Sequence, residues 1–370
     1  MSGTSMDAID AALVDIAKDQ IRLIAYRQYP ITSELRQELL SVTGISSIDH
    51  ITRLDVRMGR VFAESASALM RENNRVTSDI SAIGCHGQTI LHRPELPEPT
   101  TLQIGDPNLI AYITGITTVA DFRRMDIAAG GQGAPLAPAL HKHLFRHETK
   151  NRVVVNIGGM ANITILPAKD TSSTICGFDT GPGNVLLDAW VFKHTGQPMD
   201  ANGSWAASGA CNPKLLELLI QDDYFDLPPP KSTGRDYFNL HWLQAKLKNF
   251  NHATPPEDIQ STLVQLTAIT ITEAINQYAP STKEVIVGGG GAHNPQLMQA
   301  LARNLAKCNV ISTRDFGINP DALEAIAFAW LAKCRIEGHA GNLPAVTGAT
   351  VPVVLGCIYK PGTNGCKTST

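Results

Sequence analysis

The spacing of apolar positions divides the chain into short strands that alternate with helices. Apolar residues recur at intervals of three and four in segments 51–73 and 257–278, which predicts two long helices. Further helices are predicted at residues 33–42, 108–114, 185–192, 295–307 and 320–336. Short apolar runs typical of strands lie at residues 11–16, 21–29, 80–83, 117–120 and 284–287. Strands that alternate with helices in this way predict an α/β fold.

Length and composition narrow the class of protein. A chain of 370 residues is longer than one ordinary core needs, so we expect two domains with a cleft between them. A net charge of -3 gives no general attraction to nucleic acid or to an anionic membrane. No apolar run reaches about 18 residues, and acidic residues interrupt the first ten, so neither a membrane span nor a signal peptide is expected. Seven scattered cysteines without a Cys-x-x-Cys pair predict reduced thiols in the cytoplasm.

Residues 177–184, Gly-Phe-Asp-Thr-Gly-Pro-Gly-Asn, surround one carboxylate, Asp179, with small residues. We expect a turn here, after the apolar residues 174–176 and before the helix at 185–192. Backbone amides at a helix N-terminus suit an anion, and a lone acid beside a phosphate is the arrangement of a general base in phosphoryl transfer. A Gly/Pro-rich turn in which Asp makes only local hydrogen bonds is the alternative.

The first ten residues, Met-Ser-Gly-Thr-Ser-Met-Asp-Ala-Ile-Asp, lead into a predicted strand. Their backbone amides and hydroxyls suit phosphate oxygens, and Asp7 and Asp10 are available for a hydrated Mg²⁺. A capped chain terminus is the alternative interpretation. The chain contains no Gly-x-x-x-x-Gly-Lys-[Ser/Thr] motif, which excludes a Walker-type NTPase.

Two further glycine-rich segments follow predicted strands. Gly158 and Gly159 join two apolar strands, which repeats the layout of the N-terminal segment and suggests a second phosphate-binding turn. Residues 288–291 are four glycines between a strand and a helix, which suggests close approach by a flat ligand such as adenine. A Gly-x-Gly-x-x-Gly dinucleotide fingerprint is not satisfied, because His293 stands in place of its third glycine.

Polar residues at the end of the strand at 80–83 are candidates for substrate contact. His86, Gln88 and Thr89 follow that strand, and ligands bind at the carboxyl ends of strands in open α/β sheets. For His86, a buried histidine with satisfied hydrogen bonds is the competing interpretation.

Three charged residues are further candidates for substrate binding. Arg123 and Arg124 precede a glycine-rich loop, and an arginine fork binds a carboxylate through two hydrogen bonds. The same loop has the composition of a domain hinge. Glu324 shares a helix face with apolar residues, where a carboxylate is expected to have a partner or a substrate. A capping box with Asp321 is the alternative for Glu324.

Together these segments resemble the anhydro-N-acetylmuramic acid kinases over nearly the whole chain. The matching motifs follow the family's order, at residues 1–10, 86–89, 121–124, 130–135, 156–162, 177–184, 288–291 and 319–324. The resemblance implies an α/β fold of two ribonuclease-H-like (actin/hexokinase-type) domains, hinged over a central ATP cleft. It also implies a homodimer and a bacterial role in peptidoglycan recycling. We place the N-terminal domain at 1–125 plus 345–360, the C-terminal domain at 126–344 and a flexible tail at 361–370.

The resemblance also implies roles for individual residues. The expected reaction opens 1,6-anhydro-N-acetylmuramic acid with water and phosphorylates O6 with ATP and Mg²⁺, giving N-acetylmuramic acid 6-phosphate and ADP. Asp179 matches the catalytic base, whereas Glu324 and one of Arg123 or Arg124 match sugar-binding positions. The expected ATP contacts are Gly3, Thr4, Ser5, Met6, Asp7, Ala8, Ile9, Asp10, Gly158, Gly159, Gly289 and Gly290.

One departure and two alternatives accompany this interpretation. Family members carry a short apolar strand before the Met-Ser-Gly-Thr-Ser motif, so we expect one unfilled sheet position beside a phosphate turn anchored on one side only. A kinase for an ordinary free-hydroxyl sugar is the alternative with the same fold. A non-catalytic actin-like ATP-binding protein is the other, but it would need the nucleotide turns without Arg123, Arg124 and Glu324.

Overall fold

The computed structural model describes residues 1–3, 6–17, 20–43, 45–250 and 252–362. The chain forms two compact α/β units, which confirms the predicted class. Unit 1 comprises residues 1–140 and 322–370, and unit 2 comprises residues 141–321. Thr4 and Ser5, two of the expected ATP contacts, lie outside the described residues.

The unit boundaries lie at 140/141 and 321/322, whereas the sequence led us to place them at 125/126 and 344/345. Buried Asp126 shows why the segment after residue 125 stays with unit 1. Its Oδ1 accepts hydrogen bonds of 2.7 Å from both Asn342 Nδ2 and Thr347 Oγ1. These long-range contacts could not be read from local composition.

Unit 2 contains a five-stranded sheet in the order β11-β10-β7-β8-β9. The three strands β7, β8 and β9 are antiparallel, whereas β10 is parallel to β7 and β11 to β10. This is the predicted ribonuclease-H-like arrangement. The strands are β7 (Arg152–Ile157), β8 (Met160–Leu166), β9 (Cys176–Pro182), β10 (Glu284–Gly288) and β11 (Asn309–Ser312).

Helices cover the sheet of unit 2. The central strand β7 is buried because its Val153–Val155 run is apolar on both faces. The long helix α11 packs on β8 and β9, and α12 packs on α11 and β11. The helices are α6 (Val185–Thr195), α7 (Ser204–Ser208), α8 (Pro213–Ile220), α9 (Asp223–Asp226), α10 (Leu240–Lys248), α11 (Pro256–Tyr278) and α12 (Pro295–Asn304).

The strands of unit 1 form two sheets and a hairpin. The strands β1 (Ala8–Ala17) and β2 (Gln20–Pro30) pair antiparallel. In the second sheet, β6 (Thr118–Ala120) lies between parallel β3 (Ile83–Gly84) and antiparallel β12 (Cys357–Tyr359). The hairpin consists of β4 (Gln88–Arg93) and β5 (Thr100–Ile104).

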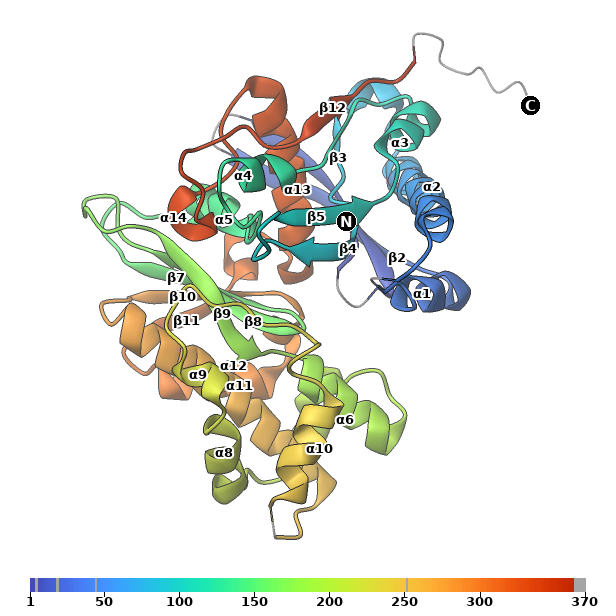
Figure 1. Ribbon diagram of the computed structural model, residues 1–370. Helices are drawn as coiled ribbons and strands as arrows, with labels where there is room; N and C mark the ends of the chain where they lie inside the picture. The colour runs from blue at the N-terminus through green and yellow to red at the C-terminus, as the bar shows by residue number, and fades with distance from the viewer. Residues whose placement is uncertain (4–5, 18–19, 44, 251, 363–370) are drawn as a thin grey trace. The chain divides into compact units, whose positions relative to one another are not determined.

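The helices of unit 1 pack on both sides of these strands (Figure 1). The apolar stripe of α2 is buried as its spacing predicts, through Leu54, Met58, Phe62 and Leu69. None of the helices in the described ranges is long and apolar enough to span a membrane. The helices are α1 (Ser33–Leu40), α2 (Ile48–Glu72), α3 (Pro107–Thr114), α4 (Arg124–Ala128), α5 (Ala137–Phe145, at the junction with unit 2), α13 (Leu323–Glu337) and α14 (Pro344–Thr347).

Candidate active site

Asp179 lies within strand β9 of unit 2, not in the turn that its Gly/Pro-rich surroundings predicted. Pairing with β8 extends this segment, and Asp179 stands opposite Asn162 next to a bulge at Ala161/Asn162. The turn expected around Asp179 comes later, at Gly183 and Asn184, before α6. Tertiary pairing has therefore overridden the local turn signal.

A loop that is distant in sequence holds Asp179 at three points. Tyr224 Oη donates a hydrogen bond of 2.8 Å to the Asp179 carbonyl, and the Asp179 N–H donates to the carbonyl of Lys231 (3.1 Å). The Thr233 N–H donates to the carboxylate oxygen Oδ2 at 3.0 Å. Lys231 Nζ fixes the loop in turn, because it donates to the carbonyls of Tyr224 and Phe225.

The environment of Asp179 changes its acidity. Burial raises the pKa of the carboxyl to about 6, although the hydrogen bond from the Thr233 N–H opposes the shift. The buried hydroxyl oxygen Oγ1 of Thr233 has no hydrogen-bond partner among the described residues. A carboxylate that titrates close to neutral pH is suited to accept a proton and to release it again.

Three glycine turns converge in unit 2. The amides of Gly183 and Asn184 donate to the carbonyls of Gly159 (2.9 Å) and Gly158 (2.8 Å). A Cβ on Gly183 would lie 2.4 Å from the Gly158 carbonyl oxygen, so only glycine permits this approach. The N–H of Val185 also donates to Gly159, at 3.0 Å. The amides of Gly183, Asn184 and Val185 were expected to bind an anion. In the structure they already donate hydrogen bonds to the carbonyl groups of Gly158 and Gly159.

The four-glycine segment lies against the same turn. Gly289 has φ +76°, and a Cβ there would lie 2.7 Å from both Asn156 Oδ1 and the Ile157 carbonyl oxygen. A Cβ on Gly290 would approach Asn184 Nδ2 to 3.4 Å. The segment of Gly289 and Gly290 thus packs closely beside the turn of Gly158 and Gly159, and the role of these glycines in nucleotide contact stays a prediction.

Arg235 is a candidate that the sequence analysis did not select. Its guanidinium lies over the turn, with Nη2 3.8 Å from the position of a Cβ on Gly159. A cation close to a glycine turn complements a phosphate group. Arg235 lies in the loop that begins with Pro228-Pro-Pro, whose composition fits a binding loop and a plain surface loop equally well, so it does not single out this residue.

In unit 1, His86 and Arg123 form a second cluster. Arg123 Nε donates to His86 Nε2 at 3.0 Å, and Arg123 Nη1 donates to the Gly133 carbonyl at 2.7 Å. Burial lowers the pKa of His86 well below its usual value, and the Arg123 charge lowers it further. His86 also packs on Phe328, with 4.5 Å between ring centroids. Both ring nitrogens are occupied, because Nδ1 lies 3.0 Å from the Gly87 carbonyl. His86 is therefore buried with satisfied hydrogen bonds in this structure, and its contact with a substrate stays a prediction.

The two arginines occupy different surroundings. Burial lowers the pKa of Arg123 to about 10, while the Glu324 and Asp126 charges oppose this. Arg124 is exposed and its Nε lies 3.7 Å from Asp121 Oδ1. Only Arg123 therefore belongs to the cluster with His86.

Glu324 is exposed on the first turn of α13, although its spacing with apolar residues suggested burial. The helix begins at Leu323 and not at residue 320, so Glu324 lies at its end, while the apolar residues that share its face further along the helix are buried. The N-cap is Ala322 without a side-chain hydrogen bond, so the capping box with Asp321 does not form. The charge of Glu324 acts on Arg123, which places the two groups in one electrostatic cluster.

Gln88 and Thr89 begin strand β4. Gln88 is buried and its Nε2 donates to the Thr89 carbonyl at 3.1 Å, while its Oε1 has no partner among the described residues. Thr89 Oγ1 accepts a hydrogen bond of 3.3 Å from Gln103 Nε2. An unpartnered buried amide oxygen suits a ligand hydroxyl or amide.

The described residues of the N-terminal segment lead into strand β1. Ile9 is buried in the apolar core, and Ala8, Ile9 and Asp10 belong to β1. Asp10 Oδ1 accepts hydrogen bonds from Tyr26 and Gln28, whereas Asp7 is exposed. Within the described part of the chain, no group of three His, Cys, Asp or Glu side chains could hold a metal ion. The contact of Asp7 and Asp10 with a hydrated metal ion stays a prediction. Gly3 and Met6 lie on either side of Thr4 and Ser5, the two residues that the structure does not describe.

Comparison with known proteins gives a consistent result. A family model described as anhydro-N-acetylmuramic acid kinase matches residues 1–361. The chain is 47% identical over 366 residues to the anhydro-N-acetylmuramic acid kinase of Saccharophagus degradans, covering 98% of each chain. It is 50% identical over 363 residues to that of Coxiella burnetii, covering 97% of this chain and 96% of the relative. For the Vibrio cholerae protein of the same name, identity is 47% over 364 residues, with 98% and 97% covered.

Proposed function

Because the chain belongs to the anhydro-N-acetylmuramic acid kinase family, we propose that it opens 1,6-anhydro-N-acetylmuramic acid and phosphorylates O6 with ATP. The products are N-acetylmuramic acid 6-phosphate and ADP, and the process served is peptidoglycan recycling. The observation that carries the proposal for this chain is Asp179, a partly buried carboxyl on β9 that a distant loop holds in place and whose pKa is raised to about 6 by burial.

The substrate dictates what the protein must do. In a 1,6-anhydro sugar, O6 is part of an internal acetal and has no proton, so a simple transfer to a hydroxyl is impossible. Water forms a bond to C1 as the C1–O6 bond breaks, and O6 forms a bond to the γ-phosphorus as the bond to ADP breaks. The water loses a proton, which a positioned base must accept.

We assign the base to Asp179. Its backbone is fixed by Tyr224 and Lys231, and one carboxylate oxygen by the Thr233 N–H. The other oxygen, Oδ1, would accept the proton of water. Fixing the base in advance lowers the entropic cost of the step.

We assign the sugar contacts to unit 1 residues Arg123, Glu324, Gln88 and Thr89. Arg123 uses Nε and Nη1 within the protein, so Nη2 would bind the lactyl carboxylate of the sugar. Glu324 would accept from a sugar hydroxyl. His86 acts indirectly, because it holds Arg123 in place.

We assign ATP to the glycine turns at Gly158–Gly159 and Gly289–Gly290 and to the segment from Gly3 to Asp10. The Arg235 guanidinium supports the phosphate role of the first turn. Mg²⁺ bound with the nucleotide would neutralise phosphate charge, and Asp7 and Asp10 would meet its water shell. We also propose that the protein acts in the cytoplasm as a homodimer.

The rate of ADP release with different sugars tests which sugar is the substrate. The purified protein with ATP and Mg²⁺ is given either the 1,6-anhydro sugar or free N-acetylmuramic acid and N-acetylglucosamine, which have a free O6 hydroxyl. We expect ADP release with the anhydro sugar at a rate at least ~100-fold above that with either free sugar. Faster turnover of a free-hydroxyl sugar would identify an ordinary sugar kinase, and no sugar dependence would indicate a non-catalytic ATP-binding protein.

A further inference from the structure

A buried carboxylate follows the arginine that we assign to the sugar. Asp126 lies on helix α4, three residues after Arg123, and its side chain is 0% exposed. Its negative charge is one of two that oppose the effect of burial on the pKa of Arg123. A buried carboxylate is costly unless its oxygens accept hydrogen bonds, so the donors around Asp126 show what it holds in place.

Three donors meet the two carboxylate oxygens of Asp126. Oδ1 accepts from Asn342 Nδ2 and Thr347 Oγ1, each at 2.7 Å, and both of these residues lie after α13 in the sequence. Oδ2 accepts from the Gly133 N–H, also at 2.7 Å. Since all three partners donate, a carboxylate, which only accepts, suits this position better than an amide.

Gly133 links Asp126 to Arg123. Its N–H donates to Asp126, while its carbonyl accepts a hydrogen bond of 2.7 Å from Arg123 Nη1. Gly133 has φ +70°, and a Cβ there would lie 3.0 Å from Ile127 Cγ1 and 3.1 Å from the Arg123 carbonyl oxygen. The turn therefore packs tightly against the start of α4, and a displacement of Gly133 would move the carbonyl that orients the guanidinium.

The backbone of the same turn is also fixed. The Gly131 N–H donates to the Asp126 carbonyl at 2.9 Å, and the Gln132 N–H donates to the Thr347 carbonyl at 2.8 Å. A Cβ on Gly131 would lie 2.3 Å from Asp126 Oδ2, so the turn packs directly on the carboxylate. Asp126 thus joins α4, the glycine turn and the segment at 342–347 at one buried point.

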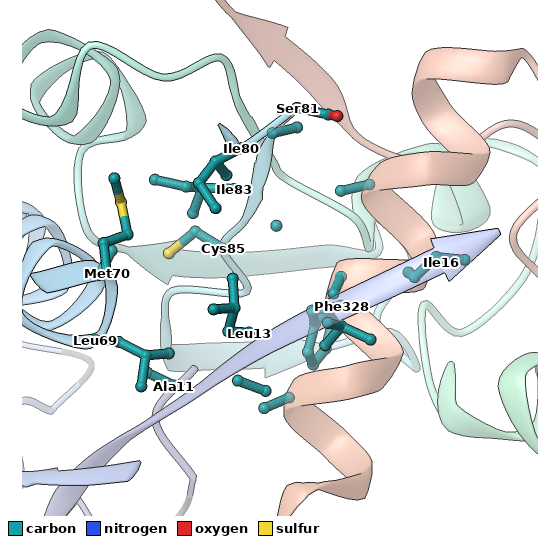
Figure 2. Close-up of a pocket in the computed structure, with 18 of the residues that line it drawn as sticks. Ala11, Leu13, Ile16, Leu69, Met70, Ile80, Ser81, Ile83, Cys85 and Phe328 are labelled. Carbon is teal, nitrogen blue, oxygen red and sulfur yellow. The ribbon is translucent and has the colours of Figure 1, made fainter. Parts of the chain in front are cut away.

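The hydrogen bond from Arg123 to His86 leads to an apolar region. His86 packs on Phe328, with 4.5 Å between ring centroids. Phe328 lines a cavity together with apolar side chains that include Leu13 (Figure 2). None of these three side chains carries a negative charge, whereas Asp126 does. In such surroundings charges and hydrogen bonds act more strongly than in water, which increases the effect of Asp126 on the guanidinium.

We propose that Asp126 is a positioning residue for substrate recognition. Through Gly133 it sets the direction of the Arg123 guanidinium, and with it the preference for a sugar that carries a carboxylate. The proposal rests on the proposed function, in which Arg123 Nη2 binds the lactyl carboxylate. A guanidinium whose Nε and Nη1 are both held presents Nη2 in one direction, which lowers the entropic cost of binding.

Asp126→Asn removes one link of this chain of hydrogen bonds. Asn342 Nδ2 must donate, because Asn342 Oδ1 accepts from the Val353 N–H at 2.8 Å. The oxygen of the new amide should therefore stay with Asn342 and Thr347, which leaves its NH₂ group facing the Gly133 N–H. Two donors repel each other, so the substitution should release Gly133 with little change in side-chain size.

The test measures how strongly two sugars bind to the parent and to Asp126→Asn. 1,6-Anhydro-N-acetylglucosamine has the same ring as 1,6-anhydro-N-acetylmuramic acid, with a hydroxyl in place of the lactyl ether. By calorimetry, Asp126→Asn should reduce the preference for the carboxylate sugar at least ~5-fold and change the affinity for the other sugar less than ~3-fold. In kinetics with the carboxylate sugar, KM should rise more than kcat falls.

Asp200→Asn is the matched control. The Asp200 carboxylate accepts from the N–H groups of Trp205 and Ala206 in unit 2, so this variant should lower the Tm and leave the sugar preference unchanged. Gly133→Ala crowds the same turn as Asp126→Asn and should reduce the preference in the same direction, even if Asp126→Asn folds poorly. An unchanged preference in both variants, or equal loss of affinity for both sugars, would overturn the proposal.

Hydrogen exchange gives a readout that depends on no sugar. Exchange at residues 130–133 should be at least ~10-fold faster in Asp126→Asn than in the parent, because the Gly133 N–H loses its acceptor. Unchanged exchange there would overturn the role of Asp126 whatever the sugars do. A parent that binds neither sugar would contradict the proposed function instead, so the two failures are distinguishable.

Discussion

Arg123 Nε donates a hydrogen bond of 3.0 Å to Nε2 of His86. Since Nε2 accepts, the imidazole proton lies on Nδ1, which donates to the Gly87 carbonyl at 3.0 Å. A neutral histidine of fixed tautomer therefore holds the guanidinium, and the lowered pKa of His86 keeps it neutral at physiological pH.

The hydrogen bond to His86 distinguishes Arg123 from its neighbour in the sequence, Arg124. Arg123→Ala should raise the KM for the sugar at least ~10-fold, because a charge-assisted contact to a carboxylate is lost. Arg124→Ala is the matched control and should change it less than ~3-fold, since that side chain is exposed. The two variants are compared by steady-state kinetics with varied sugar at saturating ATP. Equal effects would contradict the assignment.

The pH dependence of activity follows from Asp179. Burial raises the pKa of its carboxyl to about 6, and a base works only when deprotonated. In the free enzyme, kcat/KM should therefore fall about tenfold for each pH unit below 6 and level off above it. The profile is measured from pH 4.5 to 8 with a stability check at each pH. A flat profile down to pH 5 would exclude a base with this pKa.

The same raised pKa predicts that Asp179 reduces stability at neutral pH. The folded pKa of about 6 lies above the reference value of 3.8, so the folded state binds the proton more tightly. Stability then decreases as pH rises through this window, by an amount on the order of 2–3 kcal/mol at pH 7. Asp179→Asn should therefore unfold at higher denaturant than the parent at pH 7, and the difference should vanish below pH 4.

Asp222→Asn is the control variant, for which we expect the stability at pH 7 to change in the opposite direction. Burial alone would raise the pKa of Asp222, but hydrogen bonds from Tyr237, Trp242 and Lys246 lower it overall. Its ionised form is therefore stabilising, and Asp222→Asn should lower stability at pH 7. If both variants were destabilised, the account of Asp179 as a strained buried carboxylate would be wrong.

Gly289 tests the nucleotide turns. An alanine Cβ would lie 2.7 Å from Asn156 Oδ1 and the Ile157 carbonyl oxygen, at a φ of +76°. Gly289→Ala should therefore move the turn and weaken ATP binding at least ~10-fold, as measured by calorimetry. Gly317 has φ +74° but no atom within 4 Å of its Cβ position. Gly317→Ala should cost about 1 kcal/mol of stability and leave ATP affinity unchanged. Similar affinities in the two variants would contradict the role of Gly289.

The sequence predicts the helices and strands well where one periodicity dominates. The α2 stripe and the β10 run are found as expected, because apolar spacing and burial agree there. Asp179 was misplaced because Gly and Pro favour turns locally, while pairing with β8 extends the segment in the folded protein. Glu324 was expected on a buried face, but it is exposed because it lies in the first turn of α13, before the buried part of that face.

The support of the site could not be predicted from local sequence. Tyr224 and Thr233 contact Asp179 across separations of 45 and 54 residues, and Arg235 reaches the Gly158–Gly159 turn from the same loop. Contacts of this kind depend on how loops fold back on the sheet. The resemblance to a family implies that Asp179 is the base, and the structure shows which residues hold this side chain.

The central claim is that Asp179 accepts a proton from water that attacks C1 as O6 is phosphorylated. The most direct test is mass spectrometry of the product formed from ATP, Mg²⁺ and the 1,6-anhydro sugar in ¹⁸O-labelled water. We expect a sugar heavier by one phosphoryl group and one labelled water, with the label at C1, and none from folded Asp179→Asn that still binds ATP. A phosphorylated product without the label, or undiminished turnover by Asp179→Asn, would contradict the account.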